Sequence, residues 1–391
     1  MSPAAPIPYG RQSISEDDIA AVERVLRSDW LTQGPAVPAF EDAVAKYCRS
    51  SHAVAVNSAT SALHIACLAL GVGPGDLVWT SPNTFVASAN CARYCGADVD
   101  FVDIDPLTLN LCPNRLADKL AAAKLTGCLP KVVIPVHFAG QPCEMAAIHA
   151  LSQAYGFRII EDASHAIGAW YQDQPIGSGQ YSDITVLSFH PVKIITSGEG
   201  GMALTQDRQL AERMRQLRSH GITRDPQHFE ESDPGAWHYE QHVLGFNYRM
   251  TDLQAALGLS QLKRLDDFVS TRQAWVARYN QLLSGLPITL PHLAANRRSA
   301  HHLYVIQLQS EAGGASRRVV FDALRARGIL TNVHYMPVHT QPYFRKLGFA
   351  WGDFPASEHH GLNTLTLPLF PSMRQADQDR VVHSLQDLLQ P

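Results

Sequence analysis

The chain has 391 residues, of which 46% are hydrophobic and 17% are charged. The hydrophobic fraction is ordinary for a packed globular protein and the charged fraction is low, and the length allows two or three domains. Its 32 basic and 36 acidic side chains leave a formal net charge of −4, and without a polybasic tract this argues against a nucleic-acid partner. No stretch reaches the roughly 18 consecutive apolar residues of a membrane span. The start, MSPAAPIPYGRQ, lacks the pattern of a secretory signal.

The cysteines predict a reducing environment. There are seven, an odd number, and none forms a CxxC pair. No second Cys/His pair stands at zinc-site spacing, so we expect reduced core cysteines and no metal site. Together with the absence of membrane and secretion signals, this favours a cytoplasmic protein.

Strand-like and helix-like segments alternate through the first part of the chain. Helices are predicted at residues 58–70 and 143–156, and short apolar strands at residues 53–57, 77–82, 99–104, 131–138, 157–164, 183–190 and 200–205. Apolar strands separated by helices form parallel sheets that are covered on both faces. We therefore expect an α/β fold with a mostly parallel sheet.

A polar segment at residues 224–242 is predicted to be an exposed excursion. Residues 251–285 then show one long helical pattern, broken at most once, which Thr251 or Asp252 would cap. This helix is predicted to lead from a large domain (residues 1–250) into a smaller C-terminal α/β domain (residues 251–391). The smaller domain should contain strands at 302–308, 329–335 and 365–370 and helices at 317–328, 355–361 and from 373.

Lys193, in SFHPVKIITSGEGG (residues 188–201), follows a predicted buried strand. A lysine whose surroundings disfavour its charge has a lowered pKa and becomes an amine nucleophile that can bond to an aldehyde. Position alone favours an exposed loop lysine, but such loops rarely carry SF on one side and TSGEGG on the other.

Asp162 comes at the end of another predicted strand, in IIEDASHAIGA (residues 159–169). Ligands of doubly wound sheets lie outside the carboxyl ends of the strands, so this carboxylate could hold a protonated ring nitrogen. The alternative is a helix N-cap, a position that Asp favours.

Two further segments suggest ligand contacts. NSATSAL (residues 57–63) ends a strand and opens a helix with hydroxyl residues, a combination that binds phosphate through free backbone N–H groups; an ordinary capped helix is the alternative. Phe85 follows a strand end and could stack on a planar ring or belong to the core. Neither GxxxxGK[ST] nor GxGxxG occurs.

These features together match one cofactor. Pyridoxal phosphate (PLP) needs a helix end for its phosphate, a flat partner for its ring, a carboxylate for its ring nitrogen and a lysine for its aldehyde. The sequence therefore predicts a PLP site.

Several motifs resemble those of the DegT/DnrJ/EryC1/StrS sugar aminotransferases: NSATSALH, EDASHAIG, SFHPVKIITSGEGG, GFNYRMTDLQAALGLSQL and NVHYMP. The resemblance covers nearly the whole chain and implies an aspartate-aminotransferase-like (fold type I) PLP-dependent transferase. Within the family, three stretches most resemble the transaminases that form UDP-4-amino-4,6-dideoxy-N-acetyl-β-L-altrosamine in pseudaminic acid biosynthesis: SDWLTQGP, SFHPVK and HHLY…NVHY.

The resemblance implies roles for individual residues. Catalysis is expected from Lys193, which would bond to the cofactor aldehyde and move a proton between sugar and cofactor, from Asp162 at the ring nitrogen, and from His165, where many relatives have Gln. The implied cofactor-binding residues are Ser58, Ala59, Thr60, Phe85, Asp162, His165, Ser188, Lys193 and Asn247. The implied substrate-binding residues are Tyr9, Trp30, Leu31, Thr32, Asn332, Val333, His334 and Tyr335. Asn247 would reach the neighbouring subunit's cofactor, which implies a homodimer with shared sites.

The implied reaction transfers an amino group from L-glutamate to C4 of a UDP-linked 4-keto-6-deoxy-N-acetylhexosamine. Another nucleotide-linked 4-keto sugar, of the perosamine or legionaminic acid type, is the alternative within the class. Dehydrating relatives have His in place of the lysine, so Lys193 argues against a lyase. A non-catalytic regulator on the same fold is the third possibility.

Overall fold

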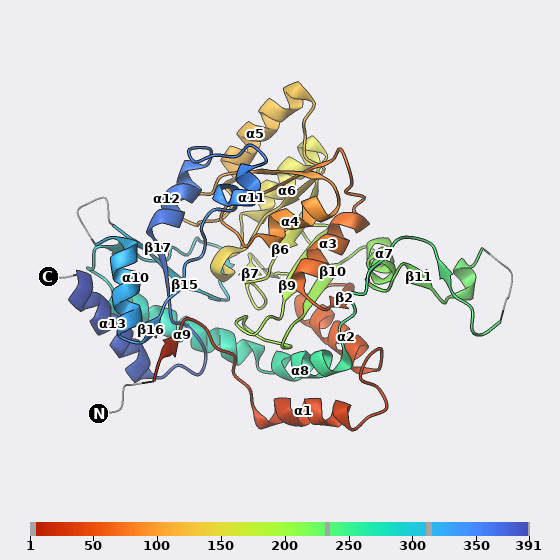
Figure 1. The fold of residues 1–391 in the computed structure, drawn as a ribbon, viewed down its shortest axis with the longest axis horizontal. Coiled ribbons are helices and arrows are strands. Elements are labelled where there is room, and N and C mark those ends of the chain that lie inside the picture. The colour runs from red at the N-terminus through yellow and green to blue at the C-terminus, as the bar shows by residue number, and fades with distance from the viewer. Residues whose placement is uncertain (1–4, 231–234, 310–314, 390–391) are drawn as a thin grey trace.

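The computed structural model of the chain describes residues 5–230, 235–309 and 315–389. A large body built on one central sheet is joined to a smaller body, and a hairpin projects from the opposite end (Figure 1). No helix within the described residues is long and apolar enough to cross a membrane. All seven cysteines are free thiols.

The central sheet has seven strands in the order β2-β10-β9-β6-β5-β3-β4. β10 runs antiparallel to both of its neighbours, and the other adjacent pairs are parallel. All seven predicted strands are therefore present, and the mostly parallel sheet is confirmed. Their bounds are β2 His52–Val56, β3 Leu77–Thr80, β4 Asp98–Phe101, β5 Val132–Ile134, β6 Arg158–Asp162, β9 Ile184–Ser188 and β10 Gly201–Thr205.

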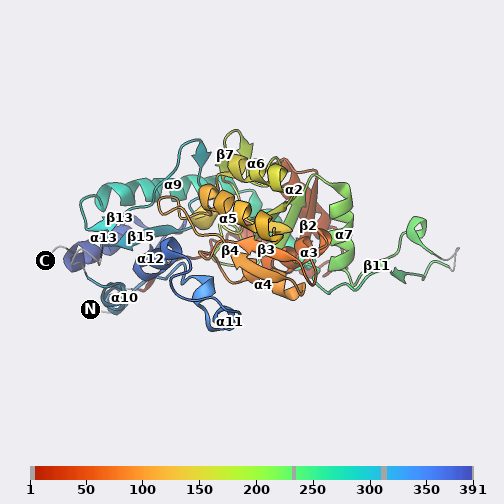
Figure 2. The same ribbon diagram turned by 90° about the horizontal axis from the view of Figure 1, so that it is seen from above.

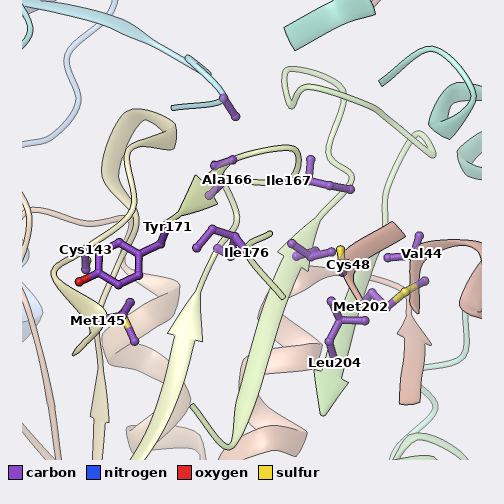
Figure 3. Packing of buried hydrophobic residues seen from close by; sticks show 14 of the residues in the cluster. Val44, Cys48, Cys143, Met145, Ala166, Ile167, Tyr171, Ile176, Met202 and Leu204 are labelled. Atoms are coloured by element: carbon purple, nitrogen blue, oxygen red, sulfur yellow. The ribbon is translucent and has the colours of Figure 1, made fainter. Parts of the chain in front are cut away.

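Helices cover both faces of this sheet, because successive strand residues point to opposite faces and both sets are apolar. In β2, for example, Val54 and Val56 join one buried cluster, whereas Ala53 and Ala55 join the other. The first cluster is completed by α3 (Ala59–Ala69), α4 (Ala87–Tyr94) and α7 (Arg208–Arg218). The second, part of which is shown in Figure 3, includes α2 (Ala36–Cys48), α5 (Pro113–Thr126) and α6 (Met145–Tyr155).

The predicted long helix is broken once. α8 (Asp252–Leu262) begins with a capping box in which the Thr251 hydroxyl accepts from the Gln254 N–H and the Gln254 side chain accepts from the Thr251 N–H. The helix stops at Lys263 and resumes after Arg264 as α9 (Leu265–Leu282), which runs into the smaller body (Figure 1). An amino-terminal helix, α1 (Glu16–Leu26), packs against α8.

The smaller body has an antiparallel sheet of β13 (Ile288–Thr289), β15 (Tyr304–Leu308) and β17 (Thr364–Leu367). It also contains α10 (Arg317–Ala326), α12 (Pro355–Asn363) and α13 (Gln375–Leu389), whereas α11 (Pro342–Arg345) packs its buried Phe344 into the first cluster of the large body. The prediction of one strand over 329–335 was wrong beyond Leu330. β16 (Ile329–Leu330) pairs only with the short amino-terminal strand β1 (Ile7–Pro8), after which the chain leaves this ladder.

The predicted excursion at residues 224–242 is confirmed as a projecting hairpin (Figures 1 and 2). Its base is β11 (Ile222–Thr223) paired with β12 (Glu240–Gln241), and residues 231–234 lie outside the described part. Trp237 and Leu244 are 78% and 80% exposed on or beside it. A further small sheet joins β7 (Trp170–Tyr171), β8 (Gln174–Pro175) and β14 (Arg297–Arg298).

Candidate active site

A cavity of about 390 Å³ lies at the carboxyl ends of β2, β6 and β9, which is where a doubly wound sheet binds its ligands. Most residues singled out from the sequence line it. They are Tyr9, Ser58, Ala59, Thr60, Phe85, Asp162, His165, Ser188, Lys193, Asn332, Val333, His334 and Tyr335. Trp30, Leu31, Thr32 and Asn247 are not among the lining residues.

The amino terminus of α3 forms one wall of the cavity. Ser58 is the N-cap, and its hydroxyl accepts the Ser61 N–H at 3.1 Å. Within the described residues, the N–H groups of Ala59 and Thr60 have no hydrogen-bond acceptor. Two free N–H groups at the positive end of a helix, with the Ser58 and Thr60 hydroxyls beside them, make a phosphate seat.

Gly201 makes this phosphate seat possible, a role that was not predicted from the sequence. The sheet register places it between Val56 and Ser188, so that it lies next to the start of α3. A Cβ at this position would stand 2.5 Å from the Ala59 nitrogen and from the Ser58 carbonyl carbon. Only glycine allows the helix start to approach the sheet this closely.

Asp162 ends β6 and is 5% exposed. One carboxylate oxygen accepts the Ser88 hydroxyl at 2.6 Å, and the other accepts the Ser164 N–H at 3.1 Å. The adjacent Glu161 points to the other face of the sheet, where its carboxylate lies 2.6 Å from His137 Nε2. Asp162 is therefore the carboxylate that the cavity receives.

Lys193 lies on the loop after β9, and its backbone N–H donates to the backbone carbonyl of His190 at 2.9 Å. Burial of the amine lowers the pKa of Lys193 to about 8, although the nearby Asp162 charge acts to raise it. A substantial fraction of the amine is consequently neutral near physiological pH, which makes it a usable nucleophile and base.

Neutral imidazoles surround the lysine. Burial, together with Lys193 and His334, lowers the pKa of His165 well below its ordinary value. The His165 Nε2 lies 3.3 Å from the Tyr335 hydroxyl. His302, which the sequence reading did not single out, lies with its ring centroid 4.5 Å from that of His165, and its pKa is also lowered by burial. These histidines can donate or accept hydrogen bonds without adding positive charge.

Residues from the smaller body and from the amino terminus close the cavity. The segment 332–335 follows β16, and Tyr9 follows β1, so the pairing of these two strands brings both segments to the same wall. The rings of Tyr9 and His334 are 5.4 Å apart. Phe85 also lines the cavity, is 58% exposed, and has its ring centroid 6.5 Å from that of Tyr335.

The four predicted residues outside the cavity lie on the surface of the chain. Trp30 and Leu31 are 56% and 48% exposed, and the Leu31 carbonyl accepts the Asp252 N–H at the start of α8. Asn247 is also exposed, and it forms a bridge with Ser219 at the base of the hairpin.

The comparisons agree on a family. Residues 12–386 match the model of the DegT/DnrJ/EryC1/StrS aminotransferase family. The chain is 41% identical over 386 residues to the spore coat polysaccharide biosynthesis protein SpsC of Bacillus subtilis, with 98% of this chain and 97% of SpsC covered.

Solved structures share the fold. The Streptococcus pneumoniae protein Spr1654 in its PLP-form has a TM-score of 0.87 and 29% identity, with 98% of each chain covered; a PMP-form of Spr1654 also matches. Helicobacter pylori PseC, an aminotransferase involved in the biosynthesis of pseudoaminic acid, has a TM-score of 0.88 and 28% identity, with 98% of this chain and 99% of PseC covered.

The residues present fit PLP: the free N–H groups of α3 suit its phosphate, the buried Asp162 carboxylate suits a protonated ring nitrogen, and the Lys193 amine suits its aldehyde. This chain belongs to the DegT/DnrJ/EryC1/StrS family and is a PLP-dependent sugar aminotransferase of fold type I.

Proposed function

We propose that the enzyme transfers the amino group of L-glutamate to C4 of a UDP-linked 4-keto-6-deoxy-N-acetylhexosamine. The products would be 2-oxoglutarate and UDP-4-amino-4,6-dideoxy-N-acetyl-β-L-altrosamine, the amino sugar of the pseudaminic acid pathway. The observation that carries the proposal is the single cavity in which Lys193, Asp162 and the start of α3 meet.

Different residues of the cavity would hold the phosphate and the ring of PLP. When bound, PLP supplies an aldehyde that carries the amino group and a ring that accepts the electron pair of a broken C–H bond. Ala59 and Thr60 would hold the phosphate through their N–H groups, with Ser58 and Ser188 adding hydroxyls. Phe85 would stack on the ring and fix its plane.

Lys193 would act twice. Its amine would first bond to the cofactor aldehyde and, once released, would take and return the proton at the reacting carbon. A pKa of about 8 suits both tasks, because the amine can hold or release a proton near neutral pH. Asp162 would keep the ring nitrogen protonated, and the neutral His165 would face the ring hydroxyl.

The part of the cavity formed by Tyr9 and residues 332–335 would receive the sugar nucleotide. Tyr9 and the segment 332–335 offer aromatic faces and polar side chains there. The structural likeness to PseC supports the pseudaminic acid type of sugar. A second candidate, another nucleotide-linked 4-keto sugar, is supported by the higher identity to SpsC, a spore coat polysaccharide protein.

We also propose a cytoplasmic homodimer in which each site is completed by the partner. Asn247 is exposed and outside its own chain's cavity, so it is free to reach a second copy. The exposed Trp237 and Leu244 give the projecting hairpin an apolar surface for that contact. The seven free thiols support a reducing compartment.

The test is a product assay with two UDP-linked 4-keto-6-deoxy-N-acetylhexosamines side by side. One is the keto sugar that leads to the L-altro amine, and the other is its D-gluco-derived counterpart. We expect keto-sugar-dependent conversion of L-glutamate to 2-oxoglutarate and an NMR spectrum of the L-altro amino sugar. Preferential turnover of the D-gluco-derived sugar would favour the second candidate.

The Lys193→Ala variant is the control for reaction chemistry. It should neither convert L-glutamate nor retain PLP on the protein after borohydride treatment, as read by mass spectrometry. Absence of turnover by the native enzyme with every nucleotide-linked keto sugar offered, despite bound PLP, would contradict the proposed reaction and favour a non-catalytic regulator.

A further inference from the structure

Two buried hydroxyl groups adjoin the Asp162 carboxylate, and neither has been given a role so far: Thr84 lines the cavity, and Ser88 lies between Thr84 and Asp162. Ser88, on α4, is fully buried, and Thr84, just before that helix, is 2% exposed. The Thr84 and Ser88 hydroxyl oxygens are 2.7 Å apart, and the Ser88 hydroxyl lies 2.6 Å from Asp162 Oδ2. The three side chains form a continuous chain of short hydrogen bonds that ends in the cavity.

The direction of this chain follows from counting protons. A carboxylate can only accept, so Ser88 must donate its single hydroxyl proton to Asp162. The Ser88 oxygen is then an acceptor toward Thr84, and the Thr84 hydroxyl must be the donor of the second bond. Each hydroxyl is polarised by the next, which strengthens the bond that reaches the carboxylate.

Two hydrogen bonds are formed by the Asp162 carboxylate within the described residues. The second carboxylate oxygen accepts one backbone N–H, from Ser164, two residues further along the chain. Ser88 is the side-chain donor among the described residues and comes from a different element. Ser88 therefore fixes the rotation of the Asp162 carboxylate about the Cβ–Cγ bond. The backbone of β6 does not control this rotation.

We propose that Ser88 is a positioning residue that aims the Asp162 carboxylate at the cofactor's ring nitrogen, and that Thr84 sets the direction of the Ser88 hydroxyl. The proposal rests on the proposed pairing of Asp162 with the ring nitrogen. Without the Ser88 hydroxyl, one buried carboxylate oxygen would lose its donor. The carboxylate could then turn, and its hold on the ring-nitrogen proton would weaken.

The experiment uses holoenzyme reconstituted with PLP that carries ¹⁵N in its ring. The ¹⁵N chemical shift reports directly whether the ring nitrogen is protonated, and it is followed as a function of pH. Ser88→Ala should lower the pH at which the ring nitrogen loses its proton by about one unit, a tenfold loss of proton affinity. The same variant should reduce kcat about 10- to 150-fold, the effect of one hydrogen bond to a charged group.

Three further variants separate positioning from packing. Thr84→Val, which removes the donor to Ser88, should shift the ¹⁵N titration in the same direction by a smaller amount, and Thr84→Ser should restore it. Ser152→Ala is the matched control, because the Ser152 hydroxyl is buried but donates only to the His149 carbonyl of its own helix. It should leave the titration unchanged.

Two outcomes would overturn the reasoning at different levels. If Asp162→Asn leaves the ¹⁵N titration at its native position, Asp162 does not face the ring nitrogen and the proposed site assignment fails. If Asp162→Asn shifts it but Ser88→Ala does not, the assignment stands and the positioning role of Ser88 is refuted.

Discussion

The lowered pKa of Lys193 can be tested without substrate or cofactor. Burial reduces it from the ordinary 10.5 to about 8. At about pH 7.5 the neutral fraction of the Lys193 amine should then be about 25%, against about 0.1% for an ordinary lysine. The exposed lysines of the same chain, such as Lys346, serve as internal references.

The assay is competitive acetylation of the cofactor-free enzyme with trace acetic anhydride, followed by digestion and mass spectrometry. The rate at Lys193 should rise with pH, half-saturate near pH 8 and then level off. Because steric access alters the plateau but not its midpoint, the midpoint is the quantity to read.

The charge of Asp162 predicts the direction in which the pKa of Lys193 should change in a variant. Its negative charge favours the protonated amine and so acts to raise the pKa of Lys193. Asp162→Asn removes that charge with little change in volume, and the midpoint of the acetylation curve should therefore move below pH 8. A native midpoint near 10, or an upward shift in Asp162→Asn, would refute the account of a desolvated amine beside a carboxylate.

Three other predictions follow from the site. Gly201→Ala places a Cβ 2.5 Å from the backbone at the start of α3. Overpacking of about 1–3 kcal/mol should weaken PLP binding about 5- to 150-fold, as measured by equilibrium titration. Gly73→Ala is the control and should leave PLP binding unchanged, because a Cβ at that position meets open space. Asp162→Asn should lower kcat by at least about 100-fold, as each ~1.4 kcal/mol lost from the transition state is tenfold in rate, with a smaller effect on PLP retention; near-normal turnover would show that Asp162 does not hold the ring nitrogen, and since β6 is followed by turns and not by a helix, the N-cap alternative is already excluded. Mixed Lys193→Ala and Asn247→Asp subunits should recover activity toward about 25% of native, since random pairing makes half of the dimers mixed and each has one intact shared site. Proven subunit exchange without recovery would place Asn247 in its own chain's site or in none.

The sequence by itself determined the layered α/β fold and the residues at the ends of its strands. Apolar runs of four to eight residues report burial on both sides, which is why the strands around Asp162 and Lys193 could be predicted. The start of α3 was equally legible, because Ser58 has the side chain that an N-cap requires. Apolar strand patterns and N-caps depend on residues adjacent in the sequence, so they can be predicted without knowing which segments pack together.

The tertiary structure decided which of these segments meet. Nothing in GGMALT shows that β10 inserts antiparallel between β2 and β9, yet that placement makes Gly201 part of the phosphate seat. The Ser88–Asp162 bond joins residues 74 positions apart, and the pairing of β1 with β16 brings Tyr9 to residues 332–335. Apolar pattern encodes that a segment is buried but not which partner it packs against, because a hydrophobic face gains the same free energy against any well-fitting surface.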